Sequence, residues 1–425
     1  ANTLSMNSGI AFLLKGNTSD VRVNGTTITP TQLDSLGLAP KVERIVYSEK
    51  NETVAGDITL DPAVRYYGHR AKDGRLEING NIYTSSNITA TYGVAVQNRY
   101  TVLPVTEEVL LNSGYVVDMS NSSGSVGIQS LAGARAVNKG KVIVGNSSSA
   151  SAGIGILAES STTNLTSVVN DSGAVIEMPY AGIGIYLDSL ELGGSVTNAG
   201  TISSTQANAL GIYAKMSSAG VLGAPITAIT NTGSINLSDN GFGIFTDNST
   251  ITNSGNITVD NPGTNSIIAI YGGRNSIINN TGGNISVGEG GIAFYGNNTA
   301  MTISGGNFST EGGTLIYAEN NTNITYTANG TTLGNKIGIY LDQSKIDLGG
   351  KNFSVMDSGS AIYLLGANAE AKSLGTMTLG NNSEGAYVKN SMMNLLGGTM
   401  NITGSNSTGI IGINSNIENT TAINA

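Results

Sequence analysis

Hydrophobic residues occur along this chain in short pieces of about three to six residues, separated by Asn, Gly, Ser and Thr. Such alternation of apolar pieces with turn-forming residues is typical of short strands joined by tight turns. Hydrophobic residues make up 39% of the sequence, with much Ile, Val, Leu and Ala. Because that is enough apolar material for a continuous core, the pattern predicts an all-β protein.

One short phrase recurs along most of the chain. It reads Gly-Ile-Tyr at Gly184–Tyr186, Gly211–Tyr213 and Gly338–Tyr340, and looser copies lie between and beyond these. Successive copies are 22 to 32 residues apart, and the later ones settle near 23. The third residues of the copies are Leu157, Tyr186, Tyr213, Phe245, Tyr271, Tyr295, Tyr317, Tyr340, Tyr363 and Tyr387.

A second phrase, with Asn-x-Gly at its centre, alternates with the first. It occurs at Val196–Ile202, Ile229–Ile235 and Ile251–Ile257. A period of about 23 residues fits one coil of a parallel β-helix, with three short strands joined by turns. We expect Asn-x-Gly to form a corner, because Asn and Gly accept a left-handed backbone at low cost. The sequence therefore predicts a right-handed parallel β-helix of about 23 residues per coil.

The first part of the chain does not follow this rhythm. Residues 1–19 resemble a first coil, and 79–425 carry the repeats. We predict that 20–78 is an insertion or small subdomain, with a short helix from Thr29 to about Gly37, because Thr-Pro is a helix-start signal. The repeats reach the last residues without a polar cap, which favours a segment of a longer protein.

Composition narrows the possible functions. The net charge is −9, which disfavours nucleic acid as a partner, since nucleic-acid binding depends on clustered Lys and Arg. The absence of Cys excludes a disulfide framework and a thiolate metal site. No apolar run approaches the length of a membrane-spanning helix. We predict no cofactor and no metal.

One segment in the first hundred residues combines cations with aromatic rings in an otherwise acidic chain. Arg side chains and Tyr hydroxyls suit a sulfated or sialylated glycan, or an acidic protein surface. The alternative is that the basic groups balance nearby acids such as Glu49, Glu52 and Glu77. The candidate ligand-binding residues are Arg65, Tyr66, Tyr67, His69, Arg70, Lys72 and Arg75.

The tyrosines of the Gly-Ile-Tyr phrase form a second candidate site. Neighbouring residues of a strand point to opposite faces, so these tyrosines point outward if the Ile side chains face the core. An outward aromatic column could bind sugar rings or a partner protein. Equally, the rings could stack on one another and only stiffen the solenoid.

Enzymatic activity is a further alternative, because β-helices also host polysaccharide lyases and hydrolases. Their sites need acids, Arg or Lys clustered on neighbouring coils, and no carboxylate pair recurs here at one phase of the repeat. The Asp-Ser-Gly segments at Asp171 and Asp357 resemble part of a protease nucleophile motif, but His69 is the only His in the chain. We therefore predict that the chain is not an enzyme.

The alternation of Gly-Ile-Tyr with Val-Thr-Asn-x-Gly-x-Ile resembles the passenger domains of type V autotransporters, most of all the large fusobacterial adhesins. The resemblance covers about 120–425. It implies secretion across the outer membrane, with membrane contact only through a C-terminal barrel outside this sequence. It also implies display on the bacterial surface and adhesion to a host-cell protein or glycan, or to another bacterium. A purely structural spacer within a larger adhesin is the alternative.

Overall fold

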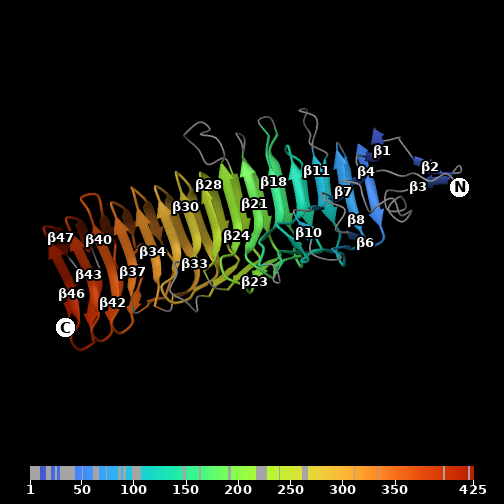
Figure 1. Cartoon of the computed structure of the whole chain (residues 1–425). Coiled ribbons are helices and arrows are strands. Elements are labelled where there is room, and N and C mark those ends of the chain that lie inside the picture. Colours follow the sequence, from blue (N-terminus) through green and yellow to red (C-terminus); the bar gives the residue numbers. More distant parts are fainter. Residues whose placement is uncertain are drawn as a thin grey trace. The chain divides into compact units, whose positions relative to one another are not determined.

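The computed structural model forms two compact units, Ala1–Leu222 (unit 1) and Gly223–Ala425 (unit 2). Every regular element in the described part of the chain is a β-strand, and almost all pair in parallel (Figure 1). The structure describes residues 10–15, 21–23, 26–28, 44–49, 51–60, 67–72, 74–84, 88–89, 92–97, 107–146, 150–161, 164–189, 193–216, 227–238, 240–260, 267–310, 312–334, 336–395, 398–419 and 422–425.

Unit 1 is a parallel β-solenoid in which three rows of strands follow one another around each coil. The first row consists of β1 (Ile10–Lys15), β4 (Arg44–Glu49), β7 (Tyr67–Lys72), β11 (Tyr92–Gln97), β15 (Val126–Leu131), β18 (Gly153–Glu159), β21 (Gly182–Ser189) and β24 (Leu210–Met216). The second row consists of β5 (Glu52–Ala55), β8 (Arg75–Asn79), β12 (Glu108–Leu111), β16 (Arg135–Asn138), β19 (Thr166–Asn170) and β22 (Gly194–Asn198). The third row consists of β6 (Ile58–Leu60), β9 (Ile82–Thr84), β13 (Val116–Met119), β17 (Lys141–Val144), β20 (Val175–Met178) and β23 (Thr201–Ser204). Outside the rows, β2 (Val21–Val23) and β3 (Thr26–Ile28) pair antiparallel, and β10 (Ile88–Thr89) pairs with β14 (Ser122–Ser123).

Unit 2 has the same three rows. The first row consists of β27 (Phe242–Asp247), β30 (Ile268–Gly273), β32 (Ile292–Asn297), β34 (Thr314–Glu319), β37 (Ile337–Asp342), β40 (Ser360–Leu365), β43 (Glu384–Lys389) and β46 (Thr408–Ile413). The second row consists of β25 (Thr227–Asn231), β28 (Ser249–Asn253), β35 (Asn323–Tyr326), β38 (Lys345–Asp347), β41 (Glu370–Lys372), β44 (Met392–Leu395) and β47 (Asn416–Asn419). The third row consists of β26 (Ser234–Leu237), β29 (Asn256–Val259), β36 (Thr331–Leu333), β39 (Phe353–Val355), β42 (Thr376–Leu379), β45 (Thr399–Ile402) and β48 (Ala422–Asn424). Two long strands bend and serve both the second and third rows, β31 (Ile277–Val287) and β33 (Ala300–Thr310).

Register confirms the predicted parallel β-solenoid and its period. Along the first row of unit 2, paired residues lie 22 to 26 positions apart, as for Phe242 with Ile268 and Tyr295 with Tyr317. In unit 1 the separation is 23 to 34 positions. Strands β4 to β8 lie within the predicted insertion 20–78, and they pair in parallel as solenoid strands. The helix predicted from Thr29 to Gly37 lies outside the described residues.

Two kinds of buried column fill the interior. The Ile residues of the Gly-Ile-Tyr phrase are fully buried, as at Ile212 and Ile339, which confirms that this position faces the core. The second column is polar. Its amide side chains are fully buried and bond to one another between coils at 2.7–2.8 Å; its members are Asn138, Asn170 and Asn198 in unit 1, and Asn231, Asn253 and Asn280 in unit 2.

A left-handed corner recurs after each first-row strand of unit 2, and not at the Asn-x-Gly phrases Asn231–Gly233 and Asn253–Gly255. It lies three residues after the third residue of the first-row phrase, where the chain leaves the first row. Gly255, in an Asn-x-Gly phrase, has no left-handed backbone, but a Cβ there would come within 2.7 Å of the Thr232 carbonyl carbon. That glycine is therefore needed for close approach between coils. The left-handed corner residues are Asn248, Arg274, Asn298, Asn320, Gln343, Gly366, Asn390 and Asn414.

Candidate functional site

Seven aromatic rings stack in one column on the outer face of the first row of unit 2. Because the rings occupy equivalent positions on paired strands, the strand spacing of about 4.8 Å brings each ring onto the next. Ring centroids lie 4.3–5.3 Å apart, and all but one pair are within 17° of parallel. The rings cover one another's faces, and their side chains are half-buried, so ring edges remain exposed to solvent. The column consists of Phe245, Tyr271, Tyr295, Tyr317, Tyr340, Tyr363 and Tyr387.

Unit 1 has a shorter version of this column. Tyr186 and Tyr213 stack with centroids 5.2 Å apart and planes 7° from parallel. The predicted self-stacking of the tyrosines is therefore observed in both units, and the side chains remain half-buried at the surface.

Two further columns flank the rings on the same face of unit 2. Three residues before the rings, four of the seven side chains are apolar, and the other three are Thr314, Ser360 and Glu384. Phe242 contacts Phe245 edge to face. Two residues after the rings, three of the seven positions are carboxylates, and the other four are Gly273, Asn297, Leu365 and Lys389. We call the three columns together the outer strip; beside the rings it contains Phe242, Ile268, Ile292 and Ile337 on the apolar side, and Asp247, Glu319 and Asp342 on the acidic side.

The acidic column bonds to the rings. The Tyr295 hydroxyl donates to Glu319 Oε1 over 2.7 Å, and the Asn297 amide donates to the same oxygen over 2.8 Å. Burial, reinforced by the hydrogen bond and charge of Glu319, raises the pKa of Tyr295. Burial also raises the pKa of Asp247, although the Arg274 guanidinium, 3.8 Å away, opposes the shift. The Tyr295 hydroxyl therefore stays protonated and able to donate.

In unit 1, alkaline titration tests whether burial and a neighbouring carboxylate raise the pKa of a stacked tyrosine. Burial, followed by the charge of Asp188 and its hydrogen bond, raises the pKa of Tyr186 to about 12 from its ordinary value of 10.0. Because the folded pKa lies above the unfolded one, the stabilisation is complete below pH 10 and is lost as the pH rises toward 12. We expect phenolate absorbance to show a late-titrating class of tyrosine, with loss of β-sheet circular dichroism over the same range.

Asp188→Asn provides the control for this titration. The substitution removes a charge that favours the neutral phenol, so the pKa of Tyr186 should fall partway toward its ordinary value. Simultaneous titration of all tyrosines near pH 10 in a folded chain would contradict the assignment.

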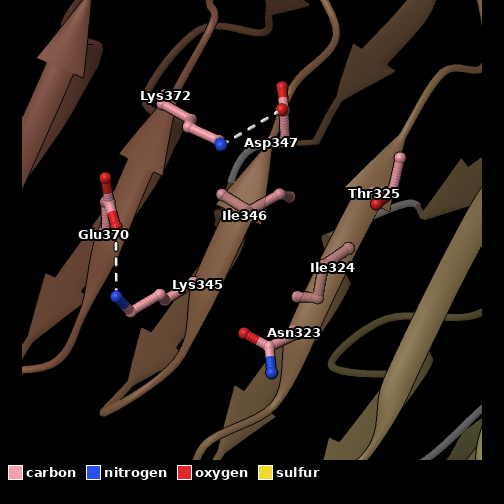
Figure 2. Close-up of a pocket in the computed structure, with 8 residues that line it drawn as sticks. All are labelled: Asn323, Ile324, Thr325, Lys345, Ile346, Asp347, Glu370 and Lys372. Carbon is pink, nitrogen blue, oxygen red and sulfur yellow. Dashed lines mark ion pairs between the residues drawn. The ribbon is translucent and has the colours of Figure 1, made fainter.

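A second candidate is a shallow depression of about 220 Å³ on the second row of unit 2 (Figure 2). The side chains of Ile324 and Ile346 form part of its lining and belong to the core, with 4% and 1% exposed. Two ion pairs cross it: Lys345 Nζ lies 3.3 Å from Glu370 Oε2, and Lys372 Nζ lies 3.5 Å from Asp347 Oδ2. Since each cation faces an acid of the adjacent coil, the depression presents no net charge to a ligand. The remaining lining residues are Asn323 and Thr325.

The predicted basic and aromatic segment falls on β7 and β8. Arg65 and Tyr66 lie outside the described residues. Tyr67, His69, Arg70 and Lys72 belong to β7, where they pair in register with Tyr92, Val94, Ala95 and Gln97 of β11.

Arg75 opens strand β8, and its side chain is described. Its guanidinium lies 3.1 Å from Glu108 and 3.8 Å from Glu77, and Arg135 also bonds Glu108, at 2.6 Å. For Arg75, this is the charge balance considered as the alternative to ligand binding. A ligand-binding role for the other residues of the segment stays a prediction.

Metal-binding side chains do not cluster within the described residues. No group of three or more His, Cys, Asp or Glu side chains there could hold a metal ion. The described ranges also contain no helix that could span a membrane.

Comparison with known proteins gives one match. No curated protein and no solved structure matches the chain significantly. The family model described as the BigA third pectate lyase-like domain, a domain of a bacterial surface protein, matches residues 54–282. This span runs from β5 in unit 1 to β31 in unit 2 and covers more than half of the 425 residues. The chain therefore belongs to the BigA third pectate lyase-like domain family.

Proposed function

We propose that this chain is an adhesive segment of a bacterial surface protein and that it makes contacts through the outer strip of unit 2. The outer strip is the observation that carries the proposal. It presents a continuous row of half-buried aromatic rings beside a column that is apolar at four of seven positions, and aromatic residues are enriched where proteins bind one another. Membership of a family found in a bacterial surface protein supports the location.

The finer assignment is a passenger segment of a large autotransporter adhesin, displayed after secretion through the outer membrane. Partners are a host-cell protein or glycan, or the surface of another bacterium. Coil-on-coil pairing supports this route, because each coil contacts only its neighbours and a solenoid can therefore fold progressively as it emerges.

We assign the chain no catalytic role, although the family description refers to pectate lyases. A fold alone does not imply an activity. In the outer strip, Glu319 already accepts hydrogen bonds from Tyr295 and Asn297. Formation of unsaturated uronides from polygalacturonate by the purified chain would overturn this assignment.

A structural spacer is the second candidate, and specific contacts favour it. The ring faces of the column are used in stacking on one another, and the charges in the depression are paired between coils. In this alternative the columns stabilise the solenoid, and binding occurs elsewhere in the parent protein.

Cell attachment distinguishes the two candidates. We expect the purified chain to bind epithelial cells or partner bacteria, and Tyr317→Phe/Tyr340→Phe to reduce binding several-fold. This variant keeps the two stacked rings and removes their hydroxyl groups. The control, Asp347→Asn/Glu370→Gln in the depression, should bind like the unchanged chain. Failure of the unchanged chain to attach would favour the spacer.

A further inference from the structure

Resting on the proposed function, we infer that the outer strip of unit 2 binds a polypeptide segment of a partner protein with one Lys/Arg-rich side and one apolar side. The strip is long enough for such a segment. Its seven rings span six intervals of 4.3–5.3 Å. The total is about 30 Å, which an α-helix of about 20 residues would cover at 1.5 Å per residue.

Ring orientation disfavours sugar as the ligand. Sugars pack their C–H faces against the face of an aromatic ring, where the π-electron density lies. Within the column, each inner ring has both faces covered by its neighbours, as Tyr340 has by Tyr317 at 4.6 Å and Tyr363 at 5.3 Å. Only edges and hydroxyls remain for a ligand, and these suit apolar and hydrogen-bonding groups of a polypeptide.

Charge selects a cationic partner. Glu319 and Asp342 occupy equivalent positions on adjacent first-row strands, β34 and β37, so two carboxylates lie on successive coils. Both contribute, after burial, to the raised pKa of Tyr317 and of Tyr340, which places both close to the rings. A third carboxylate, Asp247, lies on β27 in the same column, 3.8 Å from Arg274, and Lys389 on β43 occupies the last position of the column. This side would repel sulfated glycans, nucleic acid and anionic lipid, and would attract Lys or Arg.

The opposite side of the strip is apolar from Phe242 to Ile337 except at Thr314, and Ser360 and Glu384 follow. Phe242, Ile292 and Ile337 are half-buried there, and Ile268 is 7% exposed. A ligand lying along the rings from Phe245 to Tyr340 would therefore contact carboxylates on one side and mainly aliphatic or aromatic carbon on the other. An amphipathic basic segment provides both kinds of group along one line.

The test uses a labelled 20-residue helical peptide made of Leu and Lys, titrated with the full chain and followed by fluorescence anisotropy. We expect Glu319→Gln/Asp342→Asn to weaken binding about tenfold, because it removes two facing charges. Gln can still accept from Tyr295 and Asn297, so the fold should be retained. Ile292→Thr/Ile337→Thr, which keeps β-branched residues in the strands, should weaken binding by a similar factor.

The matched control is Asp347→Asn/Glu370→Gln, which changes net charge equally on the second row of unit 2. It should leave the dissociation constant within twofold. Equal weakening by both charge variants would show binding to net charge alone and would overturn the inference. Equal binding of a Leu/Glu peptide would also overturn it.

Cell attachment, measured in parallel, separates this inference from the proposed function. If Glu319→Gln/Asp342→Asn changes neither cell attachment nor peptide binding, the inference is overturned and the proposed adhesive function is retained. If the outer-strip substitutions weaken peptide binding but the unchanged chain attaches to no cell or bacterium, the inference is supported and the proposed adhesive function is not.

Discussion

Replacing Asn253 with Ala should lower the free energy of unfolding by about 2–6 kcal/mol, because it strands two buried amide groups that each cost about 1–3 kcal/mol. Asn253 is 0% exposed; its Oδ1 accepts from Asn231 and its Nδ2 donates to Asn280, both at 2.7 Å. Alanine can replace neither bond, and no water reaches a fully buried position without a cavity. Urea unfolding of the full chain, followed by circular dichroism, measures the loss.

Asn307→Ala is the matched control. Its amide donates to Asn284 over 2.9 Å in an equivalent bond between coils, but this pair is exposed. Water can replace the lost bond, so we expect a change of less than about 1 kcal/mol. Asn253→Asp should be at least as harmful as Asn253→Ala, since a carboxylate cannot donate to Asn280 and is costly to bury. Similar midpoints for Asn253→Ala and Asn307→Ala would show that the buried column contributes little.

The solenoid could be predicted from the sequence because the same residue types recur at equivalent positions of successive coils. Stacked coils place equivalent residues above one another, so the buried Ile and outward Tyr recur as Ile212-Tyr213 and Ile339-Tyr340. Strand alternation then assigns Ile to the core and Tyr to the surface. Self-stacking of the tyrosines followed from the same register, since a column of rings one strand spacing apart must be in contact.

The corners were harder, because Asn serves two purposes with opposite environments. Asn253, in an Asn-x-Gly phrase, points into the core and bonds other amides. Asn298 and Asn320 take the left-handed backbone that was expected of Asn-x-Gly. The residue type is the same, and only its position relative to the strand distinguishes a buried amide from a left-handed corner.

The acidic column could not be predicted because it depends on register between coils of unequal length. Tyr295 and Glu319 bond although they lie 24 residues apart in sequence. Coil separations vary from 22 to 26 residues in this row, and a slip of one residue moves a side chain to the opposite face. For the same reason the strands between residues 44 and 79 could not be recognised as solenoid strands, because coil separations in unit 1 reach 34 residues and obscure the repeat.

Replacing Gly283 with Ala should be severely disruptive, costing more than about 4 kcal/mol or preventing folding. Gly283 lies where β31 bends from the second row to the third, with φ of +78°. A Cβ there would overlap the Gly255 carbonyl of the preceding coil and come within 2.6 Å of its carbon. Since the obstacle is backbone, no rotamer change can relieve the overlap, and the two coils must separate. Thermal unfolding of the full chain measures the effect.

Gly290→Ala separates the two causes of this loss. Gly290 has nearly the same φ, +73°, but nothing lies within 4 Å of a Cβ built there. Its cost should be that of a left-handed alanine alone, about 1–2 kcal/mol. The difference between the two variants then measures how tightly the coil corners pack, independently of backbone strain. Equal unfolding midpoints for Gly283→Ala and Gly290→Ala would mean that the backbone around Gly283 adjusts at little cost. The spacing between coils, on which ring stacking in the outer strip depends, would then be set by the hydrogen-bonded strands and the buried columns alone.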